Sequence, residues 1–188
     1  NYASGDGNYY SGDTGWHPDG NYPELFAIKI AFYLDPVGRD TGCLRVLPGS
    51  HRPESIWRSG EASPRDSGAW GGEPTEIPGQ VALETEPGDL VVFNHNTWHA
   101  SFGGGRRRRM FTMNLHKRGK TAEGLERVDE YLQHHCPVEH GFKIGGMYTD
   151  LILDTAPPER LVHLEQLFAR HAQIHPEGTV PRPFPRAR

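Results

Sequence analysis

Three residues of metal-binding type stand out by their spacing. His17 and Asp19 lie two positions apart in the segment WHPDG at 16–20, and residues two apart on an extended strand point to the same side. Such a strand would present an imidazole and a carboxylate together. Since a lone pair of this kind is more often an ordinary loop feature, the interpretation depends on a third ligand. His99, which follows a Pro-Gly-Asp turn at 87–89, is the natural candidate.

Two imidazoles and one carboxylate suit a particular kind of metal chemistry. They can occupy one triangular face of an octahedron and leave three adjacent positions open, which is the arrangement of non-haem iron(II) oxygenases. A 2-oxo acid could fill two of these positions and dioxygen the third. The far carboxylate of that cosubstrate needs a planar, permanently charged partner, for which arginine is better suited than lysine. Four consecutive arginines, 106–109, follow His99.

The remaining pattern predicts short strands that would position these residues. Apolar residues alternate with a period of two over 27–34, as expected for a strand with one strongly apolar face. Further short strands, separated by turns that contain Gly, Pro or Asn, are expected at 42–47, 90–93, 98–102 and 108–115. Residues 52–80 are polar and aperiodic, which indicates a long surface excursion that could cover a site.

The composition limits the class of partner. Lysine plus arginine number 20 against 24 aspartate plus glutamate, so nothing favours nucleic acid or an anionic membrane as a partner. No apolar run approaches the roughly 18 residues of a membrane span. Cys43 and Cys136 are too few for a dense disulfide framework. We therefore expect a cytoplasmic protein; the sequence leaves its oligomeric state open.

Together the motifs resemble the phytanoyl-CoA dioxygenase family, which includes ectoine hydroxylase-like proteins. The matching segments are WHPDG at 16–20, GCLRVLPGSH at 42–51, PGD at 87–89 and HAS at 99–101, followed by the arginine-rich strand. The resemblance covers roughly residues 8–116. It implies a mainly β fold, a double-stranded β-helix (a jelly roll, cupin-like), with C-terminal helices added.

The resemblance also implies a role for each site residue. His17, Asp19 and His99 would bind Fe(II), and an arginine about ten residues beyond the distal histidine would bind 2-oxoglutarate. Aligning the strand from Met110 favours Arg108 for this role, with Arg106 on the same face and Arg107 and Arg109 pointing away. At least two of the four arginines are expected to be solvated at a strand edge. Ser101 matches a hydroxyl that assists the arginine.

The expected activity is an Fe(II)- and 2-oxoglutarate-dependent dioxygenase that uses O2, hydroxylates a small molecule and releases succinate and CO2. Asp19 supports hydroxylation, because glycine or alanine at that position would suggest a halogenase. Two alternatives remain open at this point. The chain could be a cupin-like metalloenzyme that does not use 2-oxoglutarate, or a catalytically silent jelly roll that serves as a binding module.

The resemblance suggests one oxygenase domain over residues 1–188. A jelly-roll core would span about 8–116, a helical part about 120–175 and a loose tail 176–188. Helical spacing of leucines near 125–132 and 161–168 supports the helical part. Relatives usually carry helices before the iron motif, and these are expected to be missing from this sequence.

Lys29 and two tryptophans have less certain roles. Lys29 lies on the strand face shared with Ala31 and Tyr33, and a buried ammonium requires a carboxylate partner. We therefore count Lys29 with Arg108 and Ser101 as a candidate cosubstrate-binding residue. Trp16 and Trp98 each precede a proposed ligand, and the sequence does not distinguish a pocket wall from core packing for either.

Overall fold

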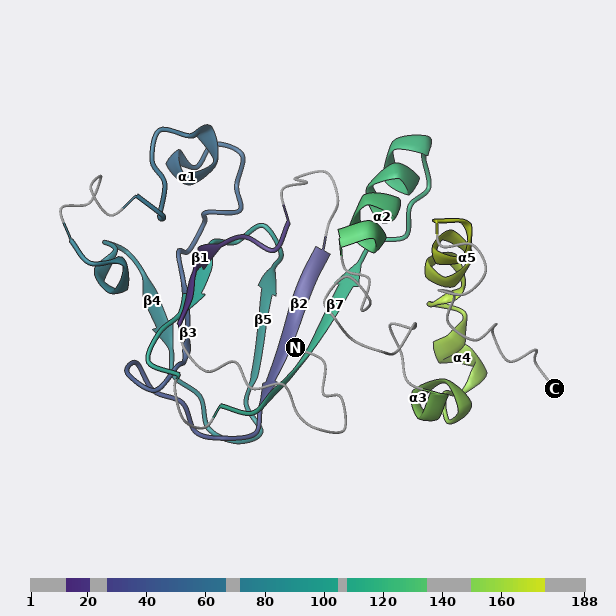
Figure 1. Ribbon diagram of the computed structural model, residues 1–188, viewed down its shortest axis with the longest axis horizontal. Helices are drawn as coiled ribbons and strands as arrows, with labels where there is room; N and C mark the ends of the chain where they lie inside the picture. The colour runs from purple at the N-terminus through teal and green to yellow at the C-terminus, as the bar shows by residue number, and fades with distance from the viewer. Residues whose placement is uncertain (1–12, 21–26, 67–71, 105–107, 135–149, 175–188) are drawn as a thin grey trace. The chain divides into compact units, whose positions relative to one another are not determined.

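The computed structural model describes residues 13–20, 27–66, 72–104, 108–134 and 150–174 (Figure 1). The chain divides into two compact units, residues 1–117 and 118–188. Among the described residues, every strand belongs to the first unit, and the second unit contains only helices. Every candidate site residue named above that the structure describes lies in the first unit.

The first unit is built from two antiparallel sheets (Figure 1). In sheet order, the four-stranded sheet comprises β1 (Thr14–His17), β6 (His99–Ser101), β3 (Leu44–Val46) and β4 (Val81–Leu83). The three-stranded sheet comprises β5 (Leu90–Asn94), β2 (Ala27–Tyr33) and β7 (Met110–His116). The chain crosses repeatedly from one sheet to the other. This is the topology of a double-stranded β-helix and confirms the predicted mainly β fold.

The predicted strands are present, with ends that differ by a few residues. The short strand β4 was not predicted, because its three residues are all apolar and therefore show no alternation. The segment at 16–19 requires a correction: β1 ends at His17 and Asp19 lies just beyond it. Pro18 explains this difference, since proline has no N–H with which to continue a ladder. The Asp19 N–H instead donates to the His95 carbonyl at 3.0 Å.

The excursion at 52–80 is not wholly a surface loop. It contains the short helix α1 (Ile56–Ser59), capped by the Ser55 hydroxyl, and the 3-10 helix η2 (Pro74–Glu76). Directly after η2, Ile77 is buried in the core at 1% exposure. A single apolar residue in a polar stretch gives no periodic signal, and for this reason the sequence did not indicate that the excursion returns to the core.

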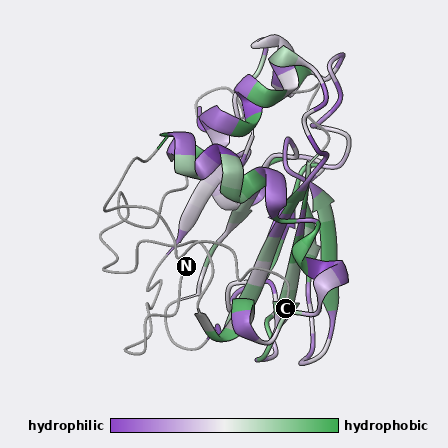
Figure 2. Ribbon diagram, turned by 90° about the vertical axis from the view of Figure 1, so that its right-hand side faces the viewer, coloured by the Kyte–Doolittle hydropathy of each residue, from purple (hydrophilic) through white to green (hydrophobic). Residues whose placement is uncertain are grey.

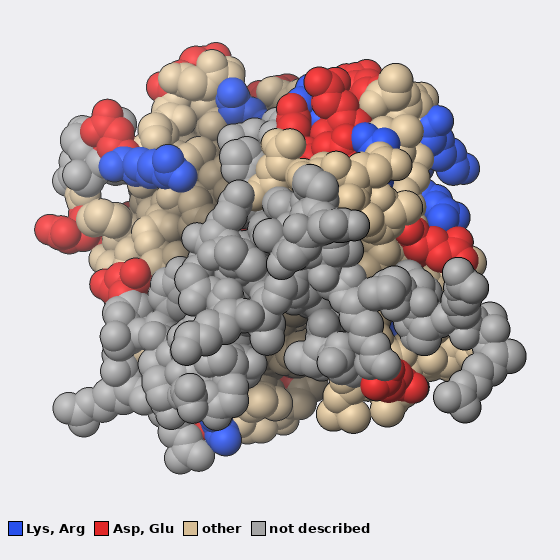
Figure 3. Space-filling model, turned by 45° about the vertical axis from the view of Figure 1, so that its right-hand side comes forward, with Lys and Arg blue, Asp and Glu red and all other residues tan. Residues whose placement is uncertain are grey.

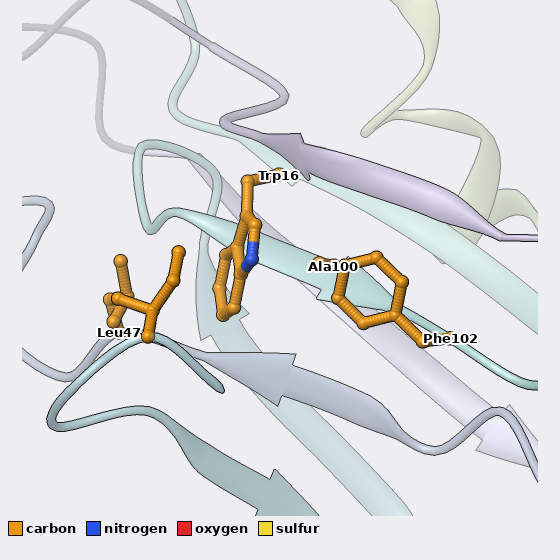
Figure 4. Packing of buried hydrophobic residues seen from close by; sticks show 5 residues of the cluster. Trp16, Leu47, Ala100 and Phe102 are labelled. Carbon is orange, nitrogen blue, oxygen red and sulfur yellow. The ribbon is translucent and has the colours of Figure 1, made fainter. Parts of the chain in front are cut away.

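The main core of the first unit is centred on Trp16. Its indole lies between Leu47 and Phe102, beside Ala100 (Figure 4), and its Nε1–H donates to the Pro74 carbonyl at 2.7 Å. Trp16 is therefore a core residue rather than a pocket wall. Because it immediately precedes His17, its packing anchors the strand that carries the first proposed ligand.

The three-stranded sheet has two different faces. Ala27, Ala31 and Tyr33 of β2 are buried, whereas the strongly apolar set that alternates with them is more exposed. Large apolar side chains are also exposed on the neighbouring strands of this sheet, at Leu90, Val92, Phe111 and Leu115. Strand register places Lys29 on the same side as the buried residues. The inner face of β2 thus combines two alanines and Tyr33 with one ammonium.

The second unit contains α2 (Ala122–His134), α3 (Asp150–Asp154), α4 (Pro158–Leu161) and α5 (Glu165–Ile174). The helix expected near 125–132 is confirmed, but the one expected over 161–168 is interrupted by a turn at 162–164, and α3 was not predicted. Helices α2 and α5 pack together, joined by a two-point Arg170–Asp129 ion pair. The predicted tail at 176–188 lies outside the described residues.

Surface properties agree with the composition. Hydrophobic residues concentrate in the strands, while hydrophilic and hydrophobic residues alternate along the helices (Figure 2). On the face shown in Figure 3, acidic and basic side chains occur in small mixed groups. Within the described ranges, no helix is both long enough and apolar enough to cross a membrane.

Candidate metal and cosubstrate site

Strand pairing brings the proposed ligands together. His17 at the end of β1 is directly opposite His99 at the start of β6 in the antiparallel register, and their ring centroids are 4.4 Å apart. Asp19 is the second residue after the end of β1. Residues separated by about eighty positions in the chain therefore meet because two short strands of one sheet pair at this point.

The ligand atoms form a compact triangle. One atom each from His17, Asp19 and His99 lie within 4.8 Å of one another, the only such cluster of potential metal ligands found among the described residues. His17 Nε2 is 3.7 Å from Asp19 Oδ1, and His99 Nε2 is 3.6 Å from Asp19 Oδ2. Ligands at right angles on bonds of about 2.1 Å lie roughly 3 Å apart. Small side-chain rotations would close the difference.

Both imidazoles are oriented by the backbone. His17 Nδ1 is 2.7 Å from the Gly15 carbonyl, and His99 Nδ1 is 2.9 Å from the Thr97 carbonyl. A carbonyl oxygen can only accept a hydrogen bond, so each Nδ1 must carry the proton. The lone pair is then on Nε2 of each ring, the nitrogen that faces Asp19. This is the tautomer and orientation that metal-binding histidines use.

Burial and charge hold His99 and Asp19 in the protonation states that a metal requires. Burial lowers the pKa of His99 to about 4, with the Asp19 carboxylate acting in the opposite direction, so this imidazole is neutral near neutral pH. Burial alone would raise the pKa of Asp19, but the interaction with the positive charge of Lys29 is the main cause that outweighs it and lowers that pKa. The carboxylate is therefore ionised.

Residues outside the triangle fix the backbone that carries it. The His95 carbonyl accepts hydrogen bonds from the N–H groups of Asp19 and Gly20. The fully buried Ser50 hydroxyl accepts the Trp98 N–H at 2.9 Å, and the Trp98 carbonyl accepts the Leu47 N–H. The segment at 48–51 forms a turn, and within it the Ser50 hydroxyl positions the residue before His99.

Arg65 links the excursion at 52–80 to both ligand segments. Its Nε–H donates to the Trp16 carbonyl at 3.0 Å, and its guanidinium lies 5.4 Å from the centre of the Trp98 ring. Trp98 is partly buried against the main core. The sequence left the role of Trp98 open. In the structure its ring packs against the main core and also contacts the guanidinium of Arg65, a residue that the sequence did not single out.

Lys29 contacts the metal-ligand set directly. Its Nζ is 2.6 Å from Asp19 Oδ2, and both side chains are mostly buried, at 18% and 15% exposure. The expectation that this inward-facing ammonium needs a carboxylate partner is confirmed. Phe93, its neighbour on β5 in the register, packs edge-on against the His99 ring at 4.9 Å. The triangle therefore has an apolar wall and a cation at its side.

Arg108 and Ser101 meet at a second polar cluster. Arg108 Nη1 donates to the Gly42 carbonyl at 3.0 Å and to the Ser101 hydroxyl, which itself donates to the Gly42 carbonyl at 2.9 Å. Gly42 has a φ of +96°, and a Cβ there would lie 2.7 Å from the Gly104 backbone. Glycine thus allows the close approach that holds the guanidinium beside the hydroxyl two residues beyond His99.

Arg109 has a different role. Its guanidinium makes two hydrogen bonds to the Asp35 carboxylate, at 2.8 and 3.0 Å, and its backbone N–H makes a third. It does point away from the Arg108 cluster, as predicted, but it is paired rather than simply solvated. Arg106 and Arg107 lie outside the described residues.

Tyr33 is a candidate that sequence reasoning missed. Burial raises its pKa to about 12, partly offset by the nearby Arg108 guanidinium, so the phenol remains protonated and can donate a hydrogen bond. It lies four residues after Lys29, on the same inner face of β2. The shared period of two with Lys29 and Ala31 was the signal that could have identified it.

The sequence matches one family profile over the region that contains the site. The profile described as Phytanoyl-CoA dioxygenase (PhyH) matches residues 5–110, more than half of the chain. The chain belongs to the phytanoyl-CoA dioxygenase family. The match includes all six candidate residues predicted from the sequence, whereas the second unit lies outside it.

Three solved structures illustrate what the chain is similar to. EvdO2 from Micromonospora carbonacea var. aurantiaca, complexed with 2-oxoglutarate, is 25% identical with a TM-score of 0.43, over 58% of this chain and 47% of that one. The non-heme alpha ketoglutarate dependent epimerase SnoN from nogalamycin biosynthesis is 20% identical, with a TM-score of 0.40 over 58% and 40%. EctD from S. alaskensis, in its apoform, is 21% identical, with a TM-score of 0.38 over 56% and 39%.

The similar region covers less than half of each of these proteins. No curated protein sequence matches the chain significantly. Membership of the family therefore rests on the PhyH match over residues 5–110.

Proposed function

We propose that the chain is an Fe(II)- and 2-oxoglutarate-dependent dioxygenase that hydroxylates a small molecule and releases succinate and CO2. The observation that carries the proposal is the ligand triangle: two Nε2 atoms and one ionised carboxylate converge, and both Nδ1–H groups are bonded to backbone carbonyls. Membership of the phytanoyl-CoA dioxygenase family supports the same activity.

The donor set fits iron(II). His17, Asp19 and His99 would hold the ion on one face, and the neutral state of His99 means that no proton must leave that ring first. Bound iron(II) would supply the redox chemistry that couples the oxidation of 2-oxoglutarate by O2 to hydroxylation. The protein's own contribution is orientation and exclusion of water, to which the ring of Phe93 and the core around Trp16 contribute.

The cosubstrate would be held by residues from both sheets. Arg108 would pair with the distal carboxylate of 2-oxoglutarate, with the Ser101 hydroxyl beside it, while the Tyr33 phenol would stay protonated on the inner face of β2. A guanidinium that is already fixed by the Gly42 carbonyl loses little freedom on binding a carboxylate. Lys29, which contacts the metal ligand Asp19, would interact with the part of the cosubstrate nearest the metal.

Succinate formation tests this function. The wild-type chain should produce succinate only when both Fe(II) and 2-oxoglutarate are supplied, and His99→Ala should abolish it. His51→Ala is the matched control, because His51 is outside the ligand triangle. Undiminished succinate production by His99→Ala would refute the assignment. Metal binding without 2-oxoglutarate dependence would instead indicate a cupin-like metalloenzyme, and absence of iron binding a silent binding module.

A further inference from the structure

Lys29 is more than an additional cation near a cosubstrate. Its ammonium contacts Asp19 Oδ2 at 2.6 Å, and this is the same carboxylate oxygen that lies 3.6 Å from His99 Nε2. The ammonium thus sits beside the carboxylate edge that faces the third ligand. Any cation held by Asp19 and His99 would have the charge of Lys29 as an immediate neighbour.

The contact is strong because both partners are largely withdrawn from water. The Asp19 and Lys29 side chains are 15% and 18% exposed, so solvent screens their interaction much less than it would at the surface. Strand pairing with β5 and β7 on both sides fixes the backbone of Lys29 in the middle of β2. Lys29 is therefore held near the ligand triangle by the sheet itself, and only its flexible side chain can move.

The charges give this arrangement opposite effects on two ligands. A divalent cation entering the triangle is repelled by the ammonium and must share Asp19 with it. A dianionic 2-oxo acid, in contrast, is attracted by the same ammonium. Binding of either ligand therefore makes binding of the other more favourable. Thermodynamic linkage requires that each ligand change the affinity for the other by the same factor.

On this basis, and resting on the function proposed above, we propose that Lys29 couples metal binding to cosubstrate binding. It weakens the hold of the triangle on a divalent metal alone and strengthens the complex that contains both metal and 2-oxoglutarate. Its flexible four-carbon stem allows the ammonium to leave Asp19 for a cosubstrate carboxylate without any movement of the sheet. Lys29 is a positioning residue for the charge balance of the site.

Binding measurements on the full 188-residue chain test the proposal without any turnover. Calorimetry would give the affinity for Mn(II) alone, for Mn(II) in the presence of 2-oxoglutarate, and for 2-oxoglutarate with Mn(II) saturating. The variants are Lys29→Met, which removes the charge, and Lys29→Arg, which keeps it. Lys120→Met is the control, because Lys120 is exposed and belongs to the other unit.

For Lys29→Met we expect Mn(II) alone to bind at least about tenfold more tightly, and 2-oxoglutarate to bind the Mn(II)-loaded chain at least about tenfold more weakly. Lys29→Arg should retain most of the coupling, and Lys120→Met all of it. A variant that had merely lost structure would weaken both affinities together, so changes of opposite sign distinguish the two cases.

Two results would overturn the inference. If Lys29→Met binds Mn(II) no more tightly than wild type, or if the enhancement by 2-oxoglutarate is unchanged, Lys29 does not couple the ligands, although the proposed function could still hold. If the wild-type chain binds no Mn(II) and no 2-oxoglutarate, the proposed function fails and the inference fails with it.

Discussion

Acidification should destabilise the metal-free chain through His99. Its side chain is 5% exposed, and its pKa is lowered from 6.5 to about 4. Between these values the unfolded chain binds a proton at this position and the folded chain does not. The free energy of unfolding is therefore highest, as far as His99 is concerned, above pH 6.5. It decreases as the pH falls towards 4.

The size of the effect follows from the two pKa values. Linkage gives a loss of about 2 kcal/mol between pH 7.5 and pH 5.0, and about 3 kcal/mol in the limit of lower pH. Asp19 does not cancel this contribution, because its pKa is lowered from 3.8 and it titrates below this range. The assay is urea unfolding of the chelator-treated chain at pH 7.5 and 5.0, read by circular dichroism.

His99→Asn isolates the contribution of this ring. The variant should lose about 2 kcal/mol less than wild type over the same pH interval, whereas His51→Asn, a replacement outside the triangle, should behave like wild type. Equal losses in wild type and His99→Asn would refute the argument that a buried neutral imidazole opposes protonation at this site.

Three further predictions concern the surroundings of the triangle. Arg108→Ala should weaken 2-oxoglutarate binding at least about tenfold by calorimetry, whereas Arg109→Ala should leave that affinity unchanged and lower stability, since Arg109 pairs with a buried carboxylate; equal effects on binding would contradict this division. Gly42→Ala should cost about 1 to 3 kcal/mol in urea unfolding because of its positive φ, and an unchanged stability would show that the loop relaxes freely. Ser50→Ala should cost about 1 to 3 kcal/mol by leaving the Trp98 N–H without its acceptor, which unfolding of Ser50→Thr would help to separate from a packing effect.

Much of the fold was predictable because its signals are local. The alternation over 27–34 and the turn residues around the other strands are enough to place most strands, and three of the site residues follow from their types and spacing. What the sequence could not give depends on long-range pairing. Asp35 pairs with Arg109 across 74 positions, and Ile77 returns to the core from a polar stretch.

The detail of the site was partly predictable for the same reason. An inward-facing lysine needs a carboxylate, but only the fold shows that this carboxylate is the metal ligand Asp19. The spacing of His17 and Asp19 suggested one continuous strand, and Pro18 ends that strand between them. The side chains of Ser50 and Arg65 bind backbone groups of the ligand segments, and His95 does so through its own carbonyl. Such contacts leave no pattern in the sequence.

The most direct test of the metal site is an anaerobic titration of the chain with Fe(II) in the presence of 2-oxoglutarate, followed by the visible charge-transfer absorption of the chelated cosubstrate. We predict one equivalent of Fe(II) at the end point for wild type and for His51→Ala. Each of His17→Ala, Asp19→Ala and His99→Ala should lose the absorption. Retention of the full signal in any of these three variants would show that the metal lies elsewhere.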